Sequence, residues 1–165
     1  MVRAEFLRIQ LRVTEINRGG GSMASYRAII AERLRRVFAP KTLGQRGEAA
    51  AARFLKRLGY KIVARGERDK QGELDLVAVD GRTVVFVEVK TRRSADAGHP
   101  VEAVDPIKQR RLTRLAVTFL KRRGLLDESA RFDIVAVTWP ADERKPTIEH
   151  FPNAFEAVGK REFFS

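Results

Sequence analysis

Residues 73–79 and 83–91 are two segments of alternating side chains joined by the pair Asp80-Gly81. Alternation is typical of β-strands, and Asp-Gly is a preferred two-residue turn of a β-hairpin. The second segment is also apolar on both of its faces, so it has to be covered on both sides. This hairpin limits the fold more than any other feature, because it requires a sheet with a layer packed against each face.

The rest of residues 44–158 supplies those layers. Gly59 follows an Ala- and Leu-rich segment and ends a predicted helix, whereas Asp105 and Pro106 form the N-cap and first turn of a second helix that Gly124 ends. Besides the hairpin, the predicted elements are helices over 44–58 and 106–123 and strands over 60–65, 131–139 and 147–150. The order α-β-β-β-α-β predicts a mixed α/β domain, with a mixed β-sheet flanked by helices.

The first forty-three residues differ from this domain. Three consecutive glycines, Gly19 to Gly21, form a flexible linker. Residues 1–22 precede Met23 and carry one strand-like segment at 7–13. They are either an upstream extension or a segment that does not belong to the native protein. After the linker, the spacing predicts a short, basic amphipathic helix over 25–38. The expected organisation is an N-terminal extension over 1–43, a domain over 44–158 and a C-terminal tail over 159–165.

The amino-acid composition limits which binding partners and which cellular compartment are expected for this chain. The chain has 33 Lys and Arg against 21 Asp and Glu, a net charge of +12, which favours a polyanionic partner: nucleic acid first, an acidic membrane surface second. A merely basic protein is the alternative. The absence of Cys excludes disulfides and thiolate metal sites. No apolar run approaches the roughly 20 residues of a transmembrane segment, so we expect a soluble, cytoplasmic protein.

The candidate catalytic and metal-binding residues lie mainly in the hairpin. Glu88 and Lys90 lie on the same face of their strand because side chains alternate, and the Asp-Gly turn brings Asp75 beside Glu88. Two carboxylates on a buried strand are costly, and a Mg²⁺ ion that keeps several water molecules would relieve that cost. The alternative is that Glu88 and Lys90 merely pair with each other at a strand edge.

Glu48 adds a third carboxylate by independent reasoning. It shares a helical stripe with Ala51, Ala52 and Leu55, and should therefore point at the sheet rather than at water. The alternative is an acid near the helix start that interacts only with the helix dipole.

The second predicted helix has an apolar stripe and a basic face. Between residues 108 and 123 there are seven Lys or Arg and no acid. Such a face is a candidate track for nucleic-acid phosphates, and a solvated face is the alternative. The expected nucleic-acid-binding residues are Lys108, Arg110, Arg111, Arg114 and Lys121 on this helix, together with Arg92 and Arg93 after the hairpin.

Five segments in order then resemble the YraN family of small bacterial proteins. That family is assigned to the restriction-endonuclease-like PD-(D/E)-x-K superfamily, close to archaeal Holliday-junction resolvases. The resemblance covers residues 44–158 and implies a restriction-endonuclease-like sheet flanked by helices. Its segments are Gly44-Gln-Arg-Gly-Glu48, Gly72-Glu-Leu-Asp75, Val87-Glu88-Val-Lys90, Lys108-Gln109 and Arg131-Phe-Asp133.

The resemblance also implies a role for each matching side chain. Asp75 and Glu88 would be the metal-binding acids and Lys90 the catalytic lysine. Glu48 would complete the catalytic site and its metal ligands, and Gln109 would be an auxiliary catalytic residue from the second helix.

Two positions depart from the pattern. Leu74 stands before Asp75 where the superfamily carries proline, and Gly66 stands where similar proteins often carry Asn, so any role of that side chain is missing. Asp133 is expected to be a structural, hydrogen-bonding acid rather than a metal ligand.

The implied function is a Mg²⁺-dependent endonuclease, with Mn²⁺ able to substitute. It would hydrolyse DNA phosphodiester bonds at branched or structured sites. A non-catalytic nucleic-acid-binding protein with the same fold is the alternative, and a membrane-surface protein that uses residues 25–38 is a third hypothesis. A homodimer would let such an enzyme cut both strands.

Overall fold

Five strands and two helices make up the described part of the chain. The computed structural model describes residues 41–94 and 104–158, which all lie in the compact unit Lys41–Ser165. The strand-like segment 7–13, the helix 25–38 and the tail 159–165 lie outside the described residues. The elements are α3 (Leu43–Arg57), β1 (Lys61–Asp69), β2 (Gly72–Asp80), β3 (Thr83–Arg92), α4 (Pro106–Arg123), β4 (Ala130–Thr138) and β5 (Thr147–Phe155). The predicted order and the predicted α/β class are confirmed.

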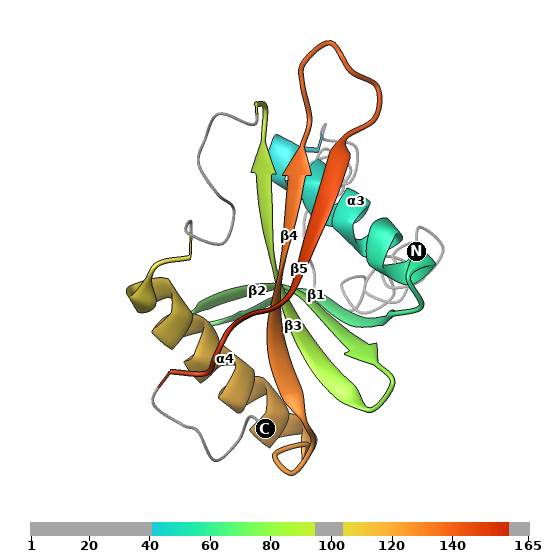
Figure 1. Ribbon diagram of the computed structural model, residues 1–165. Helices are drawn as coiled ribbons and strands as arrows, with labels where there is room; N and C mark the ends of the chain where they lie inside the picture. The colour runs from blue at the N-terminus through green and yellow to red at the C-terminus, as the bar shows by residue number, and fades with distance from the viewer. Residues whose placement is uncertain (1–40, 95–103, 159–165) are drawn as a thin grey trace, which may run out of the picture. The chain divides into compact units, whose positions relative to one another are not determined.

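The sheet is mixed, with the strands in the order β1-β2-β3-β4-β5 (Figure 1). Strands β3 and β4 pair in parallel, and the other three pairings are antiparallel. A parallel pair needs a crossover connection, which α4 supplies. This architecture is consistent with a restriction-endonuclease-like α/β fold.

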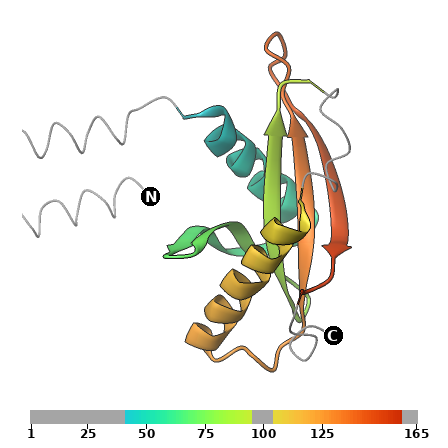
Figure 2. The same cartoon turned by 90° about the vertical axis from the view of Figure 1, so that its left-hand side faces the viewer.

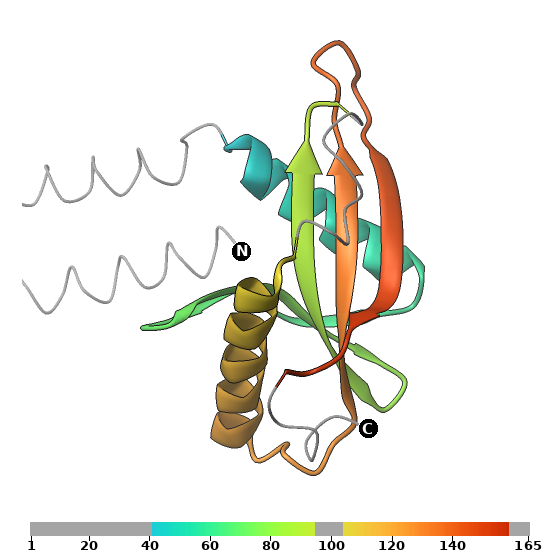
Figure 3. The same ribbon diagram turned by 60° about the vertical axis from the view of Figure 1, so that its left-hand side comes forward.

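The two helices cover opposite faces of the sheet. Val84 and Phe86 of β3 pack in the cluster that contains the apolar stripe of α4, whereas Val85 and Val87 pack in the cluster that contains Leu55 of α3. The alternation predicted for β3 therefore separates the two layers. Figure 3 shows α3 behind the strands and α4 in front of them.

Helix α3 begins with a capping box. The Thr42 side chain accepts a hydrogen bond from Gln45 N at 3.2 Å, and the Gln45 side chain accepts one from Thr42 N at 3.1 Å. This reciprocal pair satisfies two of the free amides of the first turn. The helix ends at Arg57, two residues before Gly59, whose φ of 98° suits glycine.

Helix α4 has the predicted ends. The Asp105 side chain caps it by accepting from Lys108 N at 2.8 Å, Pro106 occupies the first turn, and Gly124 ends the helix with a φ of 66°. Its stripe is buried as expected. No helix within residues 41–94 and 104–158 is long and apolar enough to span a membrane. The buried residues of this helix are Leu112, Thr113, Leu115, Ala116, Phe119 and Leu120.

Strand β2 leaves β3 before its own first residues. The β2–β3 pairing runs from Asp80 opposite Thr83 to Leu76 opposite Val87 and stops there. Beyond that point β2 continues with β1 alone, and Figure 2 shows the β1–β2 ribbon running across the direction of β3.

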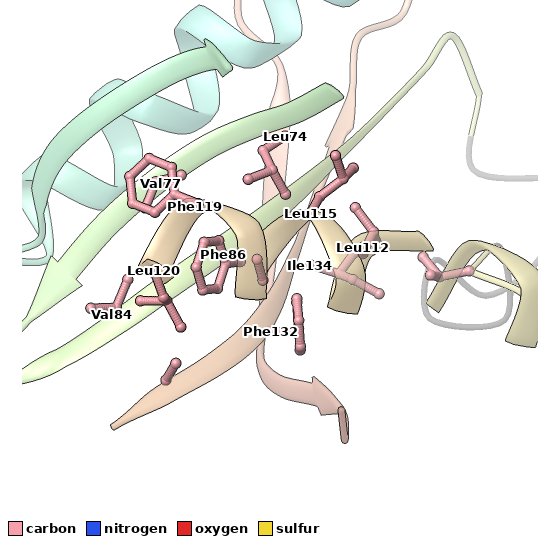
Figure 4. Packing of buried hydrophobic residues seen from close by; sticks show 13 residues of the cluster. Leu74, Val77, Val84, Phe86, Leu112, Leu115, Phe119, Leu120, Phe132 and Ile134 are labelled. Atoms are coloured by element: carbon pink, nitrogen blue, oxygen red, sulfur yellow. The ribbon is translucent and has the colours of Figure 1, made fainter. Parts of the chain in front are cut away.

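Leu74 does not share a face with Leu76 and Ala78, as strict alternation of side chains along β2 would require. Leu74 packs in the α4-side cluster with Leu115, as Figure 4 shows, whereas Leu76 and Ala78 pack on the α3 side. The change of side coincides with the point where β2 leaves β3 and continues with β1 alone, after Leu76.

Candidate active site

The point where β2 leaves β3 is marked by Asp75. Its Oδ2 atom accepts a hydrogen bond from the backbone N of Val89 at 2.8 Å, so a side chain takes the place of the missing main-chain partner. This bond holds the Asp75 carboxylate against β3, next to Glu88. The structure thus brings together the two acids that the hairpin pattern places side by side.

Glu88 is the most buried charged group of this site, with a side chain only 6% exposed. Its Oε1 atom lies 3.1 Å from Lys90 Nζ and 3.0 Å from Lys108 Nζ. Its Oε2 atom is buried and has no hydrogen-bond partner in the described part of the chain. An unpaired buried carboxylate oxygen costs free energy unless a donor or a cation satisfies it.

Burial and neighbouring charge raise the pKa of Asp75 to about 7, with burial the larger cause, followed by the Glu88 carboxylate. The charge of Glu48 acts in the same direction, while the hydrogen bond from Val89 N and the charge of Lys108 oppose it. Burial, reinforced by the neighbouring acids, therefore disfavours the charged form of Asp75.

Glu48 reaches the edge of this site from α3. Burial and the charge of Glu73 raise its pKa, against the opposing charges of Arg68 and Arg65. The Arg68 guanidinium is itself paired with Glu73 at 2.8 Å. Glu48 thus lies within electrostatic range of the β1–β2 hairpin as well as of Asp75.

Two acids rather than three form the core of the candidate metal site. Among the described residues, no group of three or more His, Cys, Asp or Glu is placed to hold a metal ion. Asp75 and Glu88 still suit Mg²⁺, which is commonly held by one or two carboxylates and keeps several water molecules. That Glu48 holds the metal or one of its water molecules stays a prediction.

The Gln109 side chain is hydrogen-bonded to the backbone just before α4. Its Nε2 donates to the backbone oxygen of Val104 at 3.0 Å, which ties the first turn of α4 to the chain that enters it. Lys108, expected to contact nucleic acid, forms an ion pair with Glu88. Its contact with nucleic acid stays a prediction. In the sequence, the one indication of the Lys108–Glu88 contact is that Lys108 lies beside the apolar stripe at the start of the helix. That position does not identify Glu88 as the partner.

The other expected nucleic-acid-binding residues lie at or near the surface. Arg110, Arg114 and Lys121 are exposed on α4, Arg111 lies against Gly72 at the β1–β2 turn, Arg92 ends β3 and Arg93 follows it. Arg110 and Arg114 also line a cavity of about 390 Å³ beside this turn. The remaining residues that line it are Gln71, Thr113, Val117, Thr118 and Val158.

A second polar cluster lies on the α3 side of β4, around the fully buried Asp133. Its carboxylate accepts from Arg131 Nε at 3.0 Å and from Asn153 N at 2.9 Å, and lies 2.9 Å from His150 Nε2. Arg131 also contacts Asp80 at 2.9 Å. Burial alone would raise the pKa of Asp133, but the hydrogen bonds from His150, Arg131 and Asn153 outweigh it and lower the pKa. Asp133 is a structural acid, as its motif suggests.

Comparison with known proteins identifies the family. The model of a family described as "Uncharacterised protein family UPF0102" matches residues 47–137, which include Glu48, Asp75, Glu88, Lys90 and Lys108. A UPF0102 protein of Rhodopirellula baltica is 50% identical over 125 residues, 74% of this chain and 75% of its own. One of Geobacter sulfurreducens is 53% identical over 116 residues, 70% and 90% of the two chains. One of Symbiobacterium thermophilum is 48% identical over 117 residues, which cover 71% of this chain and 98% of its own. The chain belongs to the UPF0102 family, in agreement with the resemblance that its five motifs carry.

Proposed function

We propose that this protein is a Mg²⁺-dependent endonuclease of the restriction-endonuclease-like superfamily, which hydrolyses DNA phosphodiester bonds at branched or structured sites. The observation that carries the proposal is the pairing of Asp75 with Glu88, whose Oε2 atom is buried without a partner among the described residues. Binding phosphate would give no reason to bury two acids, whereas binding a divalent cation would.

The donor set suits the proposed ion. Asp75 and Glu88 offer carboxylate oxygens, which Mg²⁺ prefers and which Mn²⁺ also accepts. A divalent ion held there would polarise the scissile phosphate and lower the pKa of a bound water molecule. The fit rests on the orphaned Oε2 atom of Glu88, a desolvated oxygen that a cation would satisfy.

Lys90 is the proposed catalytic cation. Its ammonium lies 3.1 Å from Glu88 and its side chain is 23% exposed, so it can reach both the acids and a bound substrate. There it would donate hydrogen bonds to phosphoryl oxygens as negative charge develops on them. Glu48 would hold a water molecule at the α3 edge of the site.

The proposed partner is DNA in the cytoplasm. The exposed Arg110, Arg114 and Lys121 would bind backbone phosphates without reading bases. A homodimer would supply a second site for the opposite strand.

Cleavage of a panel of labelled substrates tests the proposal. Linear duplex, single-stranded, fork and four-way-junction DNA, with matching RNA, would be incubated with the full chain in Mg²⁺, Mn²⁺ or EDTA. We expect cleavage of the branched DNAs in either metal, none in EDTA, and none with Glu88→Gln, which should still bind DNA. Cleavage that persists in Glu88→Gln would contradict the assigned site.

A non-catalytic nucleic-acid-binding protein is the second candidate. It is favoured by the two lysines on Glu88, since ion pairing alone could hold that carboxylate in a structural role. Calorimetric titration with Mn²⁺ separates the two candidates. An endonuclease site requires that Asp75→Asn lose most of the Mn²⁺ affinity of the wild type, whereas equal and weak binding by both proteins would favour the binding protein.

A further inference from the structure

The two lysines at Glu88 share one oxygen. Lys90 Nζ and Lys108 Nζ lie 3.1 Å and 3.0 Å from Oε1, while Oε2 has no partner among the described residues. One carboxylate charge is therefore balanced by two ammonium groups at the same atom. A cation that bound at Oε2 would be repelled by both of them.

The two ammonium groups are tethered differently. Lys90 is two residues from Glu88 on the same face of β3, about 7 Å along the strand, so it stays beside Glu88 as long as the strand is intact. Lys108 comes from a separate element, the first turn of α4. Its flexible four-carbon stem can carry the ammonium to solvent without moving the helix.

The backbone of Lys108 has its own support. Its N–H donates to the Asp105 cap at 2.8 Å, and the next residue, Gln109, is tied to Val104 O at 3.0 Å. The start of α4 therefore does not depend on the Lys108–Glu88 ion pair. The side chain can change partners while the helix stays in place.

We propose that Lys108 neutralises Glu88 in the metal-free protein and is released when a divalent cation binds at Asp75 and Glu88, so that its ammonium becomes available to substrate phosphate. This inference rests on the proposed function and adds a residue to it that binds substrate only after the metal. Lys108 is then a competitor of the metal as well as a ligand of the phosphate.

The charges of the site favour this exchange. Without a metal, the two ammonium groups balance the Asp75 and Glu88 carboxylates when both acids are ionised. A bound divalent cation adds two positive charges, which repel the movable ammonium and make the site attractive to a polyanion. Because Arg110 and Arg111 follow closely in the chain, a released Lys108 would extend the basic surface of α4 to the reacting phosphate.

Mn²⁺ calorimetry on the full chain tests the competition. Lys108→Gln removes the competing charge and should bind Mn²⁺ about tenfold more tightly than the wild type. Lys121→Gln is the matched control, because it removes the same charge from an exposed position on the same helix. It should change the affinity little. In Ca²⁺, Lys108→Gln should also bind a labelled four-way junction more weakly than Lys56→Gln, which removes the same charge from an exposed position on α3.

A second variant controls for a folding defect in Lys108→Gln. Lys108→Arg keeps the charge and should bind Mn²⁺ no more tightly than the wild type, with thermal midpoints recorded for all variants. If Lys108→Arg gained as much affinity as Lys108→Gln, charge competition would be wrong. Equal Mn²⁺ affinities of Lys108→Gln and Lys121→Gln would also overturn the exchange.

The two failures can be told apart. If Asp75→Asn loses the Mn²⁺ affinity of the wild type but Lys108→Gln matches Lys121→Gln, the metal site stands and only the exchange is overturned. If the wild type and Asp75→Asn bind Mn²⁺ equally weakly, the proposed function fails, and the exchange fails with it.

Discussion

Gly47 of α3 lies directly against the side chain of Thr91 in β3. A Cβ atom on Gly47 would overlap the Thr91 hydroxyl and lie 2.8 Å from the Thr91 Cβ atom. This close approach seats the first turns of α3 on the end of β3, with Glu48 next to Gly47 in the helix and Lys90 next to Thr91 in the strand. A helix and a strand can approach this closely only where one of them has no side chain.

Gly47→Ala should therefore be destabilising, although alanine favours helices. The added methyl has to displace α3 from β3 or distort Thr91, at a cost of about 1–3 kcal/mol. Gly44→Ala is the matched control, because its Cβ would lie 3.9 Å from the nearest atom, Thr42 Oγ1. It should leave stability unchanged or raise it by up to about 1 kcal/mol. Thermal unfolding of both variants checks this, and a Gly47→Ala protein as stable as Gly44→Ala would contradict it.

Asp75→Asn should stabilise the metal-free protein, and more so at high pH. The pKa of Asp75 is about 7 when folded, against 3.8 as the ordinary value. Well below pH 3.8 the raised pKa of Asp75 does not lower the free energy of unfolding, because the carboxyl is protonated in both the folded and the unfolded protein. The destabilisation grows as the pH rises and is complete once the folded carboxyl is ionised, above pH 7. Asparagine keeps an acceptor for Val89 N without the charge.

The measurement is chemical denaturation at about pH 4.5 and pH 8.5 in EDTA. The stability difference between Asp75→Asn and the wild type should reach about 2 kcal/mol or more at the higher pH and be much smaller at the lower one. A difference that does not change with pH would show that Asp75 ionises normally.

Asp133→Asn should be strongly destabilising at neutral pH. Asparagine cannot accept from Arg131, His150 and Asn153 together, so buried donors lose their partner at a cost of about 3–5 kcal/mol. The lowered pKa of Asp133 means that its contribution is present above about pH 4 and is lost as the pH falls further.

Urea unfolding at about pH 7 and pH 3 measures that contribution, with the exposed Asp127→Asn as the control. The gap between Asp133→Asn and the wild type should narrow at the lower pH. Mn²⁺ affinity at neutral pH should stay the same wherever the variant is folded, because Asp133 lies on the α3 side of the sheet in a separate polar cluster. A loss of Mn²⁺ affinity would instead link this cluster to the candidate site.

The exposed face of α4 should govern the salt dependence of DNA binding. The triple change Arg110→Gln, Arg114→Gln and Lys121→Gln should weaken binding to all duplexes alike. It should also reduce the slope of log affinity against log salt by about 0.9 for each phosphate that is no longer neutralised. The triple change Arg53→Gln, Lys56→Gln and Arg57→Gln on the exposed side of α3 removes the same charge. Equal slopes for the two triple variants would show that α4 contributes only net charge.

The elements of the domain could be predicted because their signals are local. The turn between β2 and β3 lies one residue later than predicted: Asp80 pairs with Thr83, so the two turn residues are Gly81 and Arg82 rather than Asp80 and Gly81. Asp105, Pro106 and Gly124 set the ends of α4 as predicted. Strand β5 runs to Phe155 and is longer than the predicted 147–150. Its second half could not be recognised in the sequence because it contains Pro152 and Asn153, residue types that strands rarely contain, and Asn153 has a positive φ. Edge strands tolerate both features.

The placement of Asp75, Glu88 and Lys90 beside one another could be predicted because these residues share the hairpin. Pairing of the two strands relates Asp75 to Glu88, strand alternation relates Glu88 to Lys90, and a sequence pattern reveals both. Lys108 reaches Glu88 from another layer, and the angle at which α4 crosses the sheet is not written in any local pattern. For the same reason, the ion pair of Arg131 with Asp80 across the sheet could not be foreseen.

The placement of both acids in one hairpin has a consequence for how the chain folds. Pairing within a hairpin closes a short loop and forms early, whereas the parallel pairing of β3 with β4 has to wait for the crossover through α4. We therefore expect Asp75 and Glu88 to meet before Lys108 arrives, when only Lys90 is near enough to offset their repulsion. At neutral pH, this early and local step of folding is opposed by its own charges, and a divalent cation in the refolding buffer should speed it.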